Sequence, residues 1–377
     1  MEPINLLIKP ASGNCNMRCR YCFYEDEMQK RSIENYGFMT SEVLEKVIEN
    51  ALAYAADYCM IAFQGGEPTL VGLDFYRKVI AYANKYNRNH CKLEYAIQTN
   101  GYLIDDEWAE FFAENRFLVG VSLDGDKKSH NRYRVDRGGK ETFSRVMETI
   151  VRLKKYKVDF NILTVVTAQM AGDARKIYNF YKTNQLMYQQ YIECLDPLGE
   201  TAGKCEYSLS ADKLSRFLKQ LFDMWYQDMM RGQYVYIRYF ENIIMILAGR
   251  IPESCTLRGE CGKQWVIESD GSVYPCDFYV LDEWKLGNLS VQSMEEIEIQ
   301  REKSGFLKNG CEIPDVCKQC KWFLLCKNGC KRNRENGLGI QGAKNRYCEA
   351  YKEFFDYTYS RFLKVMDRFG IPVRPEK

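Results

Sequence analysis

At 377 residues, with 46% hydrophobic and 14% aromatic side chains, the chain is long enough for two domains with substantial cores and is not disordered. The 53 Lys and Arg residues nearly balance 51 Asp and Glu residues, and this net charge of +2 argues against a dedicated nucleic-acid binder. No signal-peptide pattern opens the chain, and no apolar run approaches the roughly 18 residues of a transmembrane helix, so we expect a cytoplasmic protein without membrane contact. Its 16 cysteines then indicate metal ligands or catalytic thiols rather than disulfides, and its 2 histidines exclude a His-rich metal site.

Short apolar runs alternate with amphipathic segments through the first half of the chain. The predicted strands are 4–8, 60–64, 93–98, 117–123, 158–166 and 188–194. The predicted helices between them are 40–52, with Thr40 as N-cap, and 75–86, 106–114, 142–156 and 174–183. Six strands that alternate with helices predict an α/β fold of βα units around a parallel sheet. Polar loops containing Gly follow the second, third and fourth strands, at the end of the sheet where ligands bind in such folds.

The second half of the chain is organised differently. An amphipathic helix is expected at 213–230 and a closing helix at 354–369, and the segment between Cys255 and Cys348 is rich in Cys, Gly and Lys. We therefore predict four regions: the βα region 1–205, a bridging helical segment 206–254, a Cys-rich domain 255–348 and a C-terminal helix 349–377.

A first cysteine cluster follows the first predicted strand. Cys15, Cys19 and Cys22 have the spacing C-x3-C-x2-C. Three thiolates on one loop suit a [4Fe–4S] cluster, which normally takes four Cys ligands, so one iron would be open to another ligand. Zinc is the alternative, but no His lies nearby and the next cysteine is Cys59.

This motif, with Tyr21 as its aromatic residue, resembles the signature of radical S-adenosylmethionine (SAM) enzymes. Gly65, Gly66 and Glu67, followed by Pro68, resemble the GGE motif of that family. The resemblance implies a partial (β/α)6 barrel similar to a TIM barrel. It also implies that the open iron binds SAM, that one electron cleaves it to a 5′-deoxyadenosyl radical, and that the GGE residues hold the methionine amino group.

Further contacts with SAM are implied by the same resemblance. Tyr21 would pack against the adenine, Leu195 would face it, and the ribose and carboxylate would be contacted by Ser122, Arg134 and Arg152. A guanidinium suits a carboxylate by bidentate pairing, although a solvated surface charge is an equally good interpretation of either Arg.

A second set of cysteines lies in the Cys-rich domain. Its members are Cys261, Cys276, Cys317, Cys320, Cys326, Cys330 and Cys348, with Cys255 as an eighth. The pattern resembles the SPASM extension of radical SAM enzymes, in which eight thiolates fully ligate two further [4Fe–4S] clusters.

The resemblance implies that the first auxiliary cluster takes Cys255, Cys261, Cys276 and Cys330, and that the second takes Cys317, Cys320, Cys326 and Cys348. Fully ligated clusters suit electron transfer. A pair of zinc ribbons is the alternative. The five remaining cysteines are Cys59, Cys91, Cys194, Cys205 and Cys311. Cys59 and Cys194 suit a core, and Cys311 is close enough to Cys317 in sequence to compete as a ligand.

The segment 274–279, YPCDFY, resembles the anaerobic sulfatase-maturating enzymes, as do 62–70, 98–101, 194–198 and 269–288. In that family a Ser or Cys side chain of a sulfatase is oxidised to formylglycine (3-oxoalanine). The resemblance implies that Asp277 is the base and that an auxiliary cluster takes the electron. It further implies an unfolded or nascent sulfatase polypeptide as substrate and a reductant such as flavodoxin or ferredoxin. Because Cys15 lies so near the start of the chain, we expect no leader-binding domain ahead of it.

The order of the chemical steps follows from ordinary pKa values. An Asp of pKa about 3.9 deprotonates a thiol of about 8.5 at a cost of roughly 6 kcal/mol, so hydrogen abstraction should precede proton transfer. Tyr24 and Gln64 should line the same cavity, where Tyr24 could orient Asp277 and Gln64 could hold the substrate backbone. The plain alternative for Asp277 is a carboxylate that binds backbone N–H groups beside a cluster loop.

Two other functions remain open. One is a SPASM enzyme that forms thioether or carbon–carbon crosslinks in a peptide, and the other is a non-catalytic iron–sulfur or zinc protein. The sequence leaves Ser and Cys substrates equally open.

Overall fold

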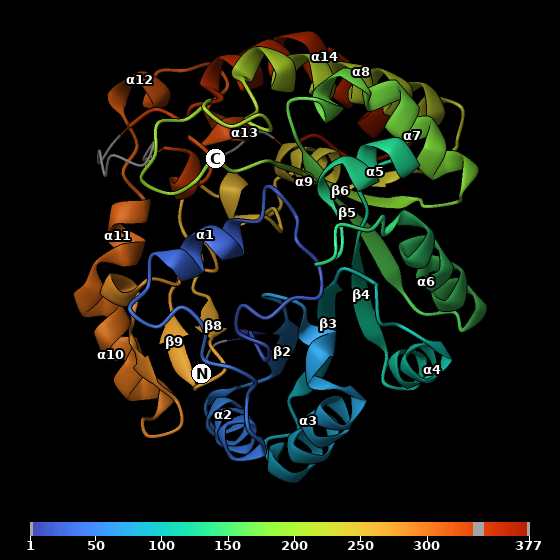
Figure 1. Cartoon of the computed structure of the whole chain (residues 1–377). Coiled ribbons are helices and arrows are strands. Elements are labelled where there is room, and N and C mark those ends of the chain that lie inside the picture. The colour runs from blue at the N-terminus through green and yellow to red at the C-terminus, as the bar shows by residue number, and fades with distance from the viewer. Residues whose placement is uncertain (1–2, 335–342, 375–377) are drawn as a thin grey trace. The chain divides into compact units, whose positions relative to one another are not determined.

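The computed structural model describes residues 3–334 and 343–374 (Figure 1). The chain divides into two compact units that are each discontinuous in sequence. The first unit comprises Met1–Ser122, Asn131–Phe160 and Lys263–Leu307, and the second comprises Leu123–His130, Asn161–Gly262 and Lys308–Lys377. This division differs from the four predicted regions, whose boundaries stay predictions. Within the described residues, no helix is long and apolar enough to cross a membrane.

The first unit is built on one sheet in which β8, β1, β2, β3 and β4 run parallel in that order. β9 pairs antiparallel with β8, and β10 pairs antiparallel with β9. The strands of this unit are β1 (Ile4–Ile8), β2 (Tyr58–Phe63), β3 (Lys92–Thr99), β4 (Phe117–Ser122), β8 (Trp265–Ile267), β9 (Ser272–Tyr274) and β10 (Gly287–Asn288).

Helices connect these strands, and α2 and α3 lie side by side (Figure 1). The helices of the first unit are α1 (Phe23–Gln29), α2 (Ser41–Tyr54), α3 (Leu73–Tyr86), α4 (Asp106–Glu114), α6 (Phe143–Lys155) and α10 (Met294–Ser304). Thr40 caps α2 by accepting from the amide of Val43 at 3.3 Å, as its position ahead of the apolar pattern predicted. Two short helices, α5 (Lys127–Tyr133) and α11 (Phe306–Gly310), each contain residues of both units.

The second unit contains three strands and six helices that lie wholly within its described residues, apart from the first residue of β5. They are β5 (Phe160–Val166), β6 (Tyr188–Glu193), β7 (Tyr236–Ile237), α7 (Ala174–Thr183), α8 (Ala211–Met230), α9 (Arg238–Leu247), α12 (Asp315–Lys318), α13 (Phe323–Cys326) and α14 (Cys348–Arg368). β5, β6 and β7 run parallel, and α8 packs along α14.

Aromatic side chains fill both cores. In the first unit, the Tyr76 ring lies 4.9 Å from Phe63 and 5.2 Å from Trp108, centroid to centroid. In the second unit, Phe222 lies 4.7 Å from Phe362. These rings join helices to strands in the first unit and α8 to α14 in the second, so each unit has its own apolar core.

All six predicted strands of the first half are present, with their ends shifted by at most two residues. The sequence analysis missed β8, which pairs in parallel with β1 through Leu6–Trp265 and Ile8–Ile267. Three residues of strand are too few to show a period, so this element left no signal in the sequence.

Candidate active site

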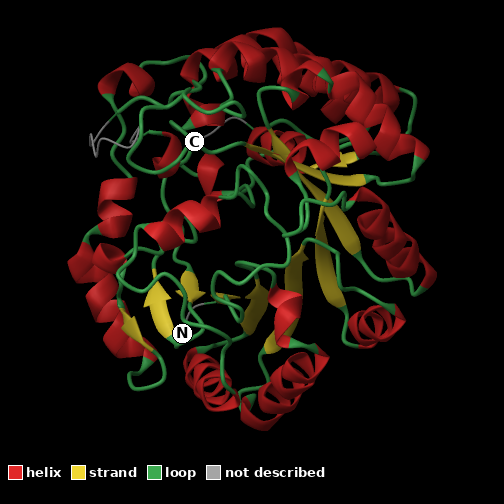
Figure 2. Cartoon of the chain, viewed as in Figure 1, coloured by secondary structure: helices red, strands yellow, loops and turns green. Residues whose placement is uncertain are grey.

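The loop after β1 carries Cys15, Cys19 and Cys22, and the segment 133–137 holds it in place. Figure 2 draws the residues between β1 and α1 as loop. The amide of Arg18 donates to the carbonyl of Val135 at 2.8 Å, and the guanidinium of Arg137 donates to the carbonyl of Cys15 at 2.6 Å. The loop is therefore ordered by its backbone, which leaves its thiols available as ligands.

Burial raises the pKa of the Cys15 thiol to about 12, and it also raises the pKa of the Cys22 thiol. These two thiols are electrostatic neighbours, and the guanidinium of Arg134 lowers the pKa of both. A metal ligand must be a thiolate, so this half-buried set needs a strong positive charge to ionise. The irons of a cluster would supply that charge, and the donor set fits the predicted [4Fe–4S] cluster.

The loop after β2 docks directly against the cysteine loop. Gly65 and Gly66 have φ angles of +95° and +54°, and a Cβ added to Gly66 would lie 2.3 Å from the carbonyl oxygen of Asn14. The amide of Glu67 donates to that same oxygen at 2.8 Å. Only glycine allows this close approach of two backbones, which explains the residue types of the predicted GGE motif.

The Glu67 carboxylate is 1% exposed and joins the ends of neighbouring strands. It accepts hydrogen bonds from the hydroxyls of Thr69 at 2.6 Å and Thr99 at 2.7 Å, and from the amide of Asn100 at 2.7 Å. Burial raises its pKa, and these donors oppose that rise. In this chain the carboxylate thus holds the two loops together, and its contact with the methionine amino group stays a prediction.

Asn100 is a site residue that the sequence analysis passed over. Its side-chain amide donates to Asn16 at 2.8 Å and to the sulfur of Cys15 at 3.7 Å, while its own amide N–H binds Glu67. It therefore ties the cysteine loop to the GGE loop. Its only signal in the sequence was the turn QTNG after the third strand.

The predicted SAM contacts fall into different surroundings. Arg134 is buried and donates to the hydroxyl of Tyr21 at 3.0 Å, which favours a buried role over a solvated surface charge. Ser122 ends β4 and accepts from Gln98, the penultimate residue of β3, at 3.1 Å. These side chains lie at the carboxyl ends of neighbouring strands, as expected for a ligand site.

Arg152 and Leu195 have no such neighbours within the part of the chain that the structure describes. Arg152 lies on α6, where its guanidinium faces the carboxylate of Glu148 at 3.8 Å. Leu195 follows β6 in the second unit. Their contacts with SAM stay predictions.

The structure brings together the three predicted catalytic side chains. The hydroxyl of Tyr24 donates to Oδ2 of Asp277 at 2.7 Å, and Nε2 of Gln64 lies 3.0 Å from Oδ2 and 2.6 Å from the Tyr24 hydroxyl. Asp277 is 7% exposed, and its other oxygen, Oδ1, is buried without a hydrogen-bond partner among the described residues. One oxygen is thus fixed and the other is free to take a proton.

Burial raises the pKa of the Asp277 carboxyl, while Lys9 and the hydrogen bonds from Tyr24 and Gln64 oppose the rise. The pKa of the Tyr24 hydroxyl lies well above its usual value, first through burial and then through the charge of Asp277. Tyr24 therefore acts as a donor to the carboxylate and does not itself ionise.

Lys9 is a second residue that the sequence analysis missed. It is 2% exposed, and its ammonium lies 4.8 Å from the centre of the Tyr24 ring and 3.7 Å from the carboxylate of Glu268. Arg31 donates to that carboxylate at 2.7 Å, and the two cations lower the pKa of Glu268. Positive charge thus lies beside the catalytic trio.

Glu27 on α1 is a third missed residue. It is 3% exposed, and burial raises its pKa to about 8, an effect that Lys9 and Arg31 offset only in part. The charge of Asp277 pushes the pKa of Glu27 up as well. No pattern in the sequence distinguishes it from the acidic residues beside it.

Four cysteines of the second unit line one pocket. They are Cys317, Cys320, Cys326 and Cys348, the set predicted for the second auxiliary cluster. Burial raises the pKa of the Cys326 thiol to about 12 and raises the pKa of Cys317 and Cys348, with neighbouring thiols adding to each rise. The gathered thiols fit a cluster with four Cys ligands.

Cys255, Cys261 and Cys330 form a second group in this unit. Burial raises the pKa of the Cys330 thiol to about 12, and Cys255 and Cys261 are the neighbouring thiols that raise it further. Cys311 adds to the rise at Cys261 and does not line the pocket of the other four. Cys276 belongs to the first unit, and its place as the fourth ligand stays a prediction. Within the described residues, no three His, Cys, Asp or Glu side chains are grouped as ligands of a single metal ion.

Comparison with protein families gives two matches. The model of the radical SAM superfamily matches residues 10–181, and that of SPASM, an iron–sulfur cluster-binding domain, matches residues 259–321. Both matches lie inside the regions 1–205 and 255–348 that the sequence predicted.

Known proteins resemble the chain over nearly its whole length. A cysteine-type anaerobic sulfatase-maturating enzyme of Clostridium perfringens is 47% identical over 366 residues, which cover 97% of this chain and 99% of the relative. A serine-type enzyme of Bacteroides thetaiotaomicron is 31% identical, with 96% and 92% covered. The solved structure of anSMEcpe with bound AdoMet and Kp18Cys peptide superposes with a TM-score of 0.93 at 46% identity, covering 97% of this chain and 100% of that chain.

Proposed function

The chain belongs to the anaerobic sulfatase-maturating enzymes of the radical SAM superfamily, and we propose that it oxidises a cysteine side chain of a sulfatase polypeptide to formylglycine. Family membership confirms the expected α/β radical SAM fold with a C-terminal SPASM domain, and the parallel sheet is consistent with a partial barrel. It also confirms [4Fe–4S] clusters and SAM as the cofactors.

The observation that carries the proposal is that only one of the two Asp277 carboxylate oxygens is hydrogen-bonded among the described residues. Tyr24 and Gln64 fix Oδ2, and Oδ1 has no partner among the described residues. A base needs one oxygen that is free to accept a proton and a carboxylate that does not turn. A carboxylate that served only to bind the backbone of a cluster loop would have amide donors on its oxygens.

SAM bound at Cys15, Cys19 and Cys22 through their cluster would supply a 5′-deoxyadenosyl radical for removal of one hydrogen from the substrate Cβ, and an auxiliary cluster would supply an acceptor for the remaining electron. The chain's own residues handle the proton. Oδ1 of Asp277 takes the thiol proton as the carbon–sulfur bond gains double-bond character. Water then replaces sulfur, which leaves as hydrogen sulfide, and the aldehyde of formylglycine remains.

Burial makes Asp277 a stronger base, and the groups that oppose this rise in its pKa support abstraction first and proton transfer second. Proton transfer from a thiol to an ordinary Asp carboxylate costs roughly 6 kcal/mol. Burial of Asp277 lowers this cost, while Lys9, Tyr24 and Gln64 oppose that effect. A resting thiol therefore keeps its proton, and the carboxylate becomes an adequate base once the neighbouring carbon radical has made the thiol more acidic.

We favour cysteine over serine because of the relatives. The cysteine-type enzyme is 47% identical and the serine-type enzyme is 31% identical. The relatives also favour side-chain oxidation over the formation of peptide crosslinks. A low-potential donor such as flavodoxin or ferredoxin would supply the electron that cleaves SAM, and the many described cysteines that form no disulfide suit a reducing cytoplasm.

The test is mass spectrometry of two short peptides that carry a (Cys/Ser)-x-Pro-x-Arg motif. Each is incubated anaerobically with reconstituted enzyme, reductant and SAM. We expect conversion of the Cys peptide to the aldehyde and slower loss of two hydrogens from the Ser peptide. If 5′-deoxyadenosine accumulates and neither peptide changes, the substrate assignment is wrong. A crosslinked product would favour the alternative function.

A further inference from the structure

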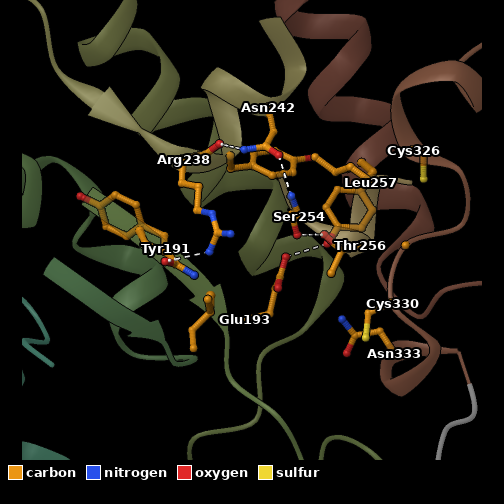
Figure 3. A pocket seen from close by; sticks show the side chains of 15 residues that line it. Tyr191, Glu193, Arg238, Asn242, Ser254, Thr256, Leu257, Cys326, Cys330 and Asn333 are labelled. Carbon is orange, nitrogen blue, oxygen red and sulfur yellow. Dashed lines mark hydrogen bonds between the residues drawn. The ribbon is translucent and has the colours of Figure 1, made fainter. Parts of the chain in front are cut away.

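Two buried polar regions of the structure have no assigned step in the reaction. One is the pocket of the second unit in Figure 3, whose lining includes Cys330 and both chain neighbours of Cys255, namely Ser254 and Thr256. That pocket therefore belongs to the surroundings of a predicted auxiliary cluster. The other region surrounds Lys9 in the first unit, a cation that is 2% exposed and lies beside the catalytic trio.

Lys9 follows β1, and both its backbone and its stem are held in place. Its amide donates to the carbonyl of Ile267 at 2.7 Å, which extends the pairing of β1 with β8. A Cβ added to Gly65 would lie 2.6 Å from Cε and 2.8 Å from Cγ of Lys9. The methylene stem thus occupies the space that a side chain at position 65 would need, so the first glycine of the GGE motif leaves room for Lys9.

The ammonium of Lys9 does more than pair with Glu268. It lies 3.7 Å from that carboxylate, beyond the length of an ordinary hydrogen bond, and the same oxygen, Oε2, accepts from Arg31 at 2.7 Å. Glu268 therefore has a closer cation. The ammonium also lies 4.8 Å from the centre of the Tyr24 ring, a distance at which a cation and an aromatic ring attract each other.

Charge joins Lys9 to the carboxylates around it. Burial raises the pKa of the Asp277 and Glu27 carboxyls, and the charge of Lys9 is the strongest influence that opposes this rise at each. At Glu268 burial acts in the same direction, but Lys9 and Arg31 hold the pKa below its usual value. One buried ammonium thus attracts three buried carboxylates, so its displacement would cost more than one ion pair.

We propose that Lys9 is a positioning residue for the oxidation: its ammonium holds the Tyr24 ring, and Tyr24 in turn holds Oδ2 of Asp277. The Tyr24 hydroxyl donates to Oδ2 at 2.7 Å, so a ring that turned away would remove that donor. The carboxylate would then lose the fixed orientation that a base requires. The inference rests on the proposed function, because it assigns Lys9 to the same proton transfer.

The experiment removes the charge of Lys9 and keeps its stem. Lys9→Met is compared with the wild type in anaerobic reactions of reconstituted holoenzyme, SAM, reductant and the Cys peptide, with 5′-deoxyadenosine and aldehyde both quantified. We expect 5′-deoxyadenosine at close to the wild-type rate. The kcat for aldehyde should fall about tenfold or more while the KM for the peptide changes less than about threefold, since a misplaced base slows a step after binding.

A second variant separates positioning from the balance of a buried ion pair. Lys9→Met/Glu268→Gln removes the ammonium together with its nearest carboxylate, so it also decides the matter if Lys9→Met alone does not fold. A double variant that forms aldehyde at the wild-type rate overturns the proposal, because Lys9 would then serve only to balance Glu268. Equal loss of 5′-deoxyadenosine and aldehyde overturns it as well. In a cycle with Tyr24→Phe, the effects of Lys9→Met should be non-additive, since both changes act through one hydroxyl.

Two further measurements complete the test. Lys85→Met, on the exposed face of α3, is the control and should leave both products at wild-type levels. A crystal structure of the double variant needs no substrate: a Tyr24 hydroxyl that still donates to Oδ2 of Asp277 overturns the positioning role. A wild type that forms no aldehyde contradicts the proposed function, whereas a wild type and a double variant with equal aldehyde formation contradict only the role of Lys9.

Discussion

At the scale of single residues, the site depends on buried charges that are only partly compensated. Among the described residues, Asp277 has two donors on one oxygen and none on the other, and Glu67 has donors on both of its oxygens. The arrangement at Asp277 suits a base, and the arrangement at Glu67 suits a carboxylate that holds two loops together. Two buried carboxylates thus suit different purposes because their partners differ.

Glu27 gives a prediction about stability and pH. Its carboxyl has a pKa of about 8 in the folded protein and an ordinary value of 4.5, so the folded state retains its proton after the unfolded state has released it. The free energy of unfolding should therefore fall as pH rises from about 4.5 to 8 and be level above that range. Glu27→Gln carries no ionisable group, so its advantage over the wild type should grow to a few kcal/mol by pH 8.

The measurement is anaerobic urea unfolding of both proteins at several pH values between 5 and 8. Glu49→Gln, on the surface of α2, serves as the control and should keep a constant difference from the wild type. Parallel curves for Glu27→Gln and the wild type would mean that Glu27 is ionised in the folded protein.

The sequence predicted the residues of this site that belong to motifs, and it missed those that do not. The resemblance to the sulfatase-maturating enzymes implied Asp277, and Tyr24 and Gln64 were expected because they follow a cluster cysteine and a strand. Lys9, Glu27 and Asn100 carry no such signal. Their importance comes from burial against partners distant in the chain, as in the contact between Lys9 and Glu268.

At the scale of elements, the turns after β1 and β2 determine the geometry of the site. The amide of Glu67 donates to the carbonyl of Asn14, and that carbonyl oxygen lies where a Cβ on Gly66 would stand. The two loops therefore interlock through their backbones. This interlock explains why glycines stand where the strand ends. Periodicity predicted the strands, but the interlock itself depends on three-dimensional proximity and could not be predicted.

Gly66→Ala should disrupt this interlock. Its Cβ would meet the Asn14 oxygen at 2.3 Å, so one loop must move, and we expect weaker SAM binding by about tenfold or more together with lower iron content. Gly72→Ala is the matched control, because Gly72 also has a positive φ, +83°, but has open space around it. Equal effects of the two substitutions on the SAM Kd would show that backbone strain, rather than the contact between loops, is responsible.

At the scale of the whole molecule, the sequence predicted the parallel strands, and the family resemblance implied the grouping of the four cysteines that line one pocket. The sequence did not predict the two discontinuous units or the pairing of β8 with β1, because the segment 263–307 lies far along the chain and has only short strands. The closing helix was expected from residue 354, but α14 starts at Cys348, and its first turn buries Ala350 and Tyr351.

The pocket of four cysteines predicts how iron content responds to mutation. Cys320→Ala should remove the second auxiliary cluster and lower bound iron by about one third, as expected for a loss of one cluster in three. Cys311→Ala should leave iron content unchanged, because Cys311 does not line that pocket and is not among the four ligands predicted for the other auxiliary cluster. Iron and sulfide analysis of reconstituted protein measures both. Loss of iron in Cys311→Ala would make Cys311 a ligand.

Asp277→Asn tests the central claim most directly, because it keeps the shape of the side chain and removes its basicity. Two products are measured in one anaerobic reaction with the Cys peptide: 5′-deoxyadenosine by chromatography and the aldehyde by mass spectrometry. Asp74→Asn, on the exposed face of α3, is the control. We predict that Asp277→Asn still forms 5′-deoxyadenosine but yields no aldehyde, whereas aldehyde formation at the wild-type rate would contradict the assignment of Asp277 as the base.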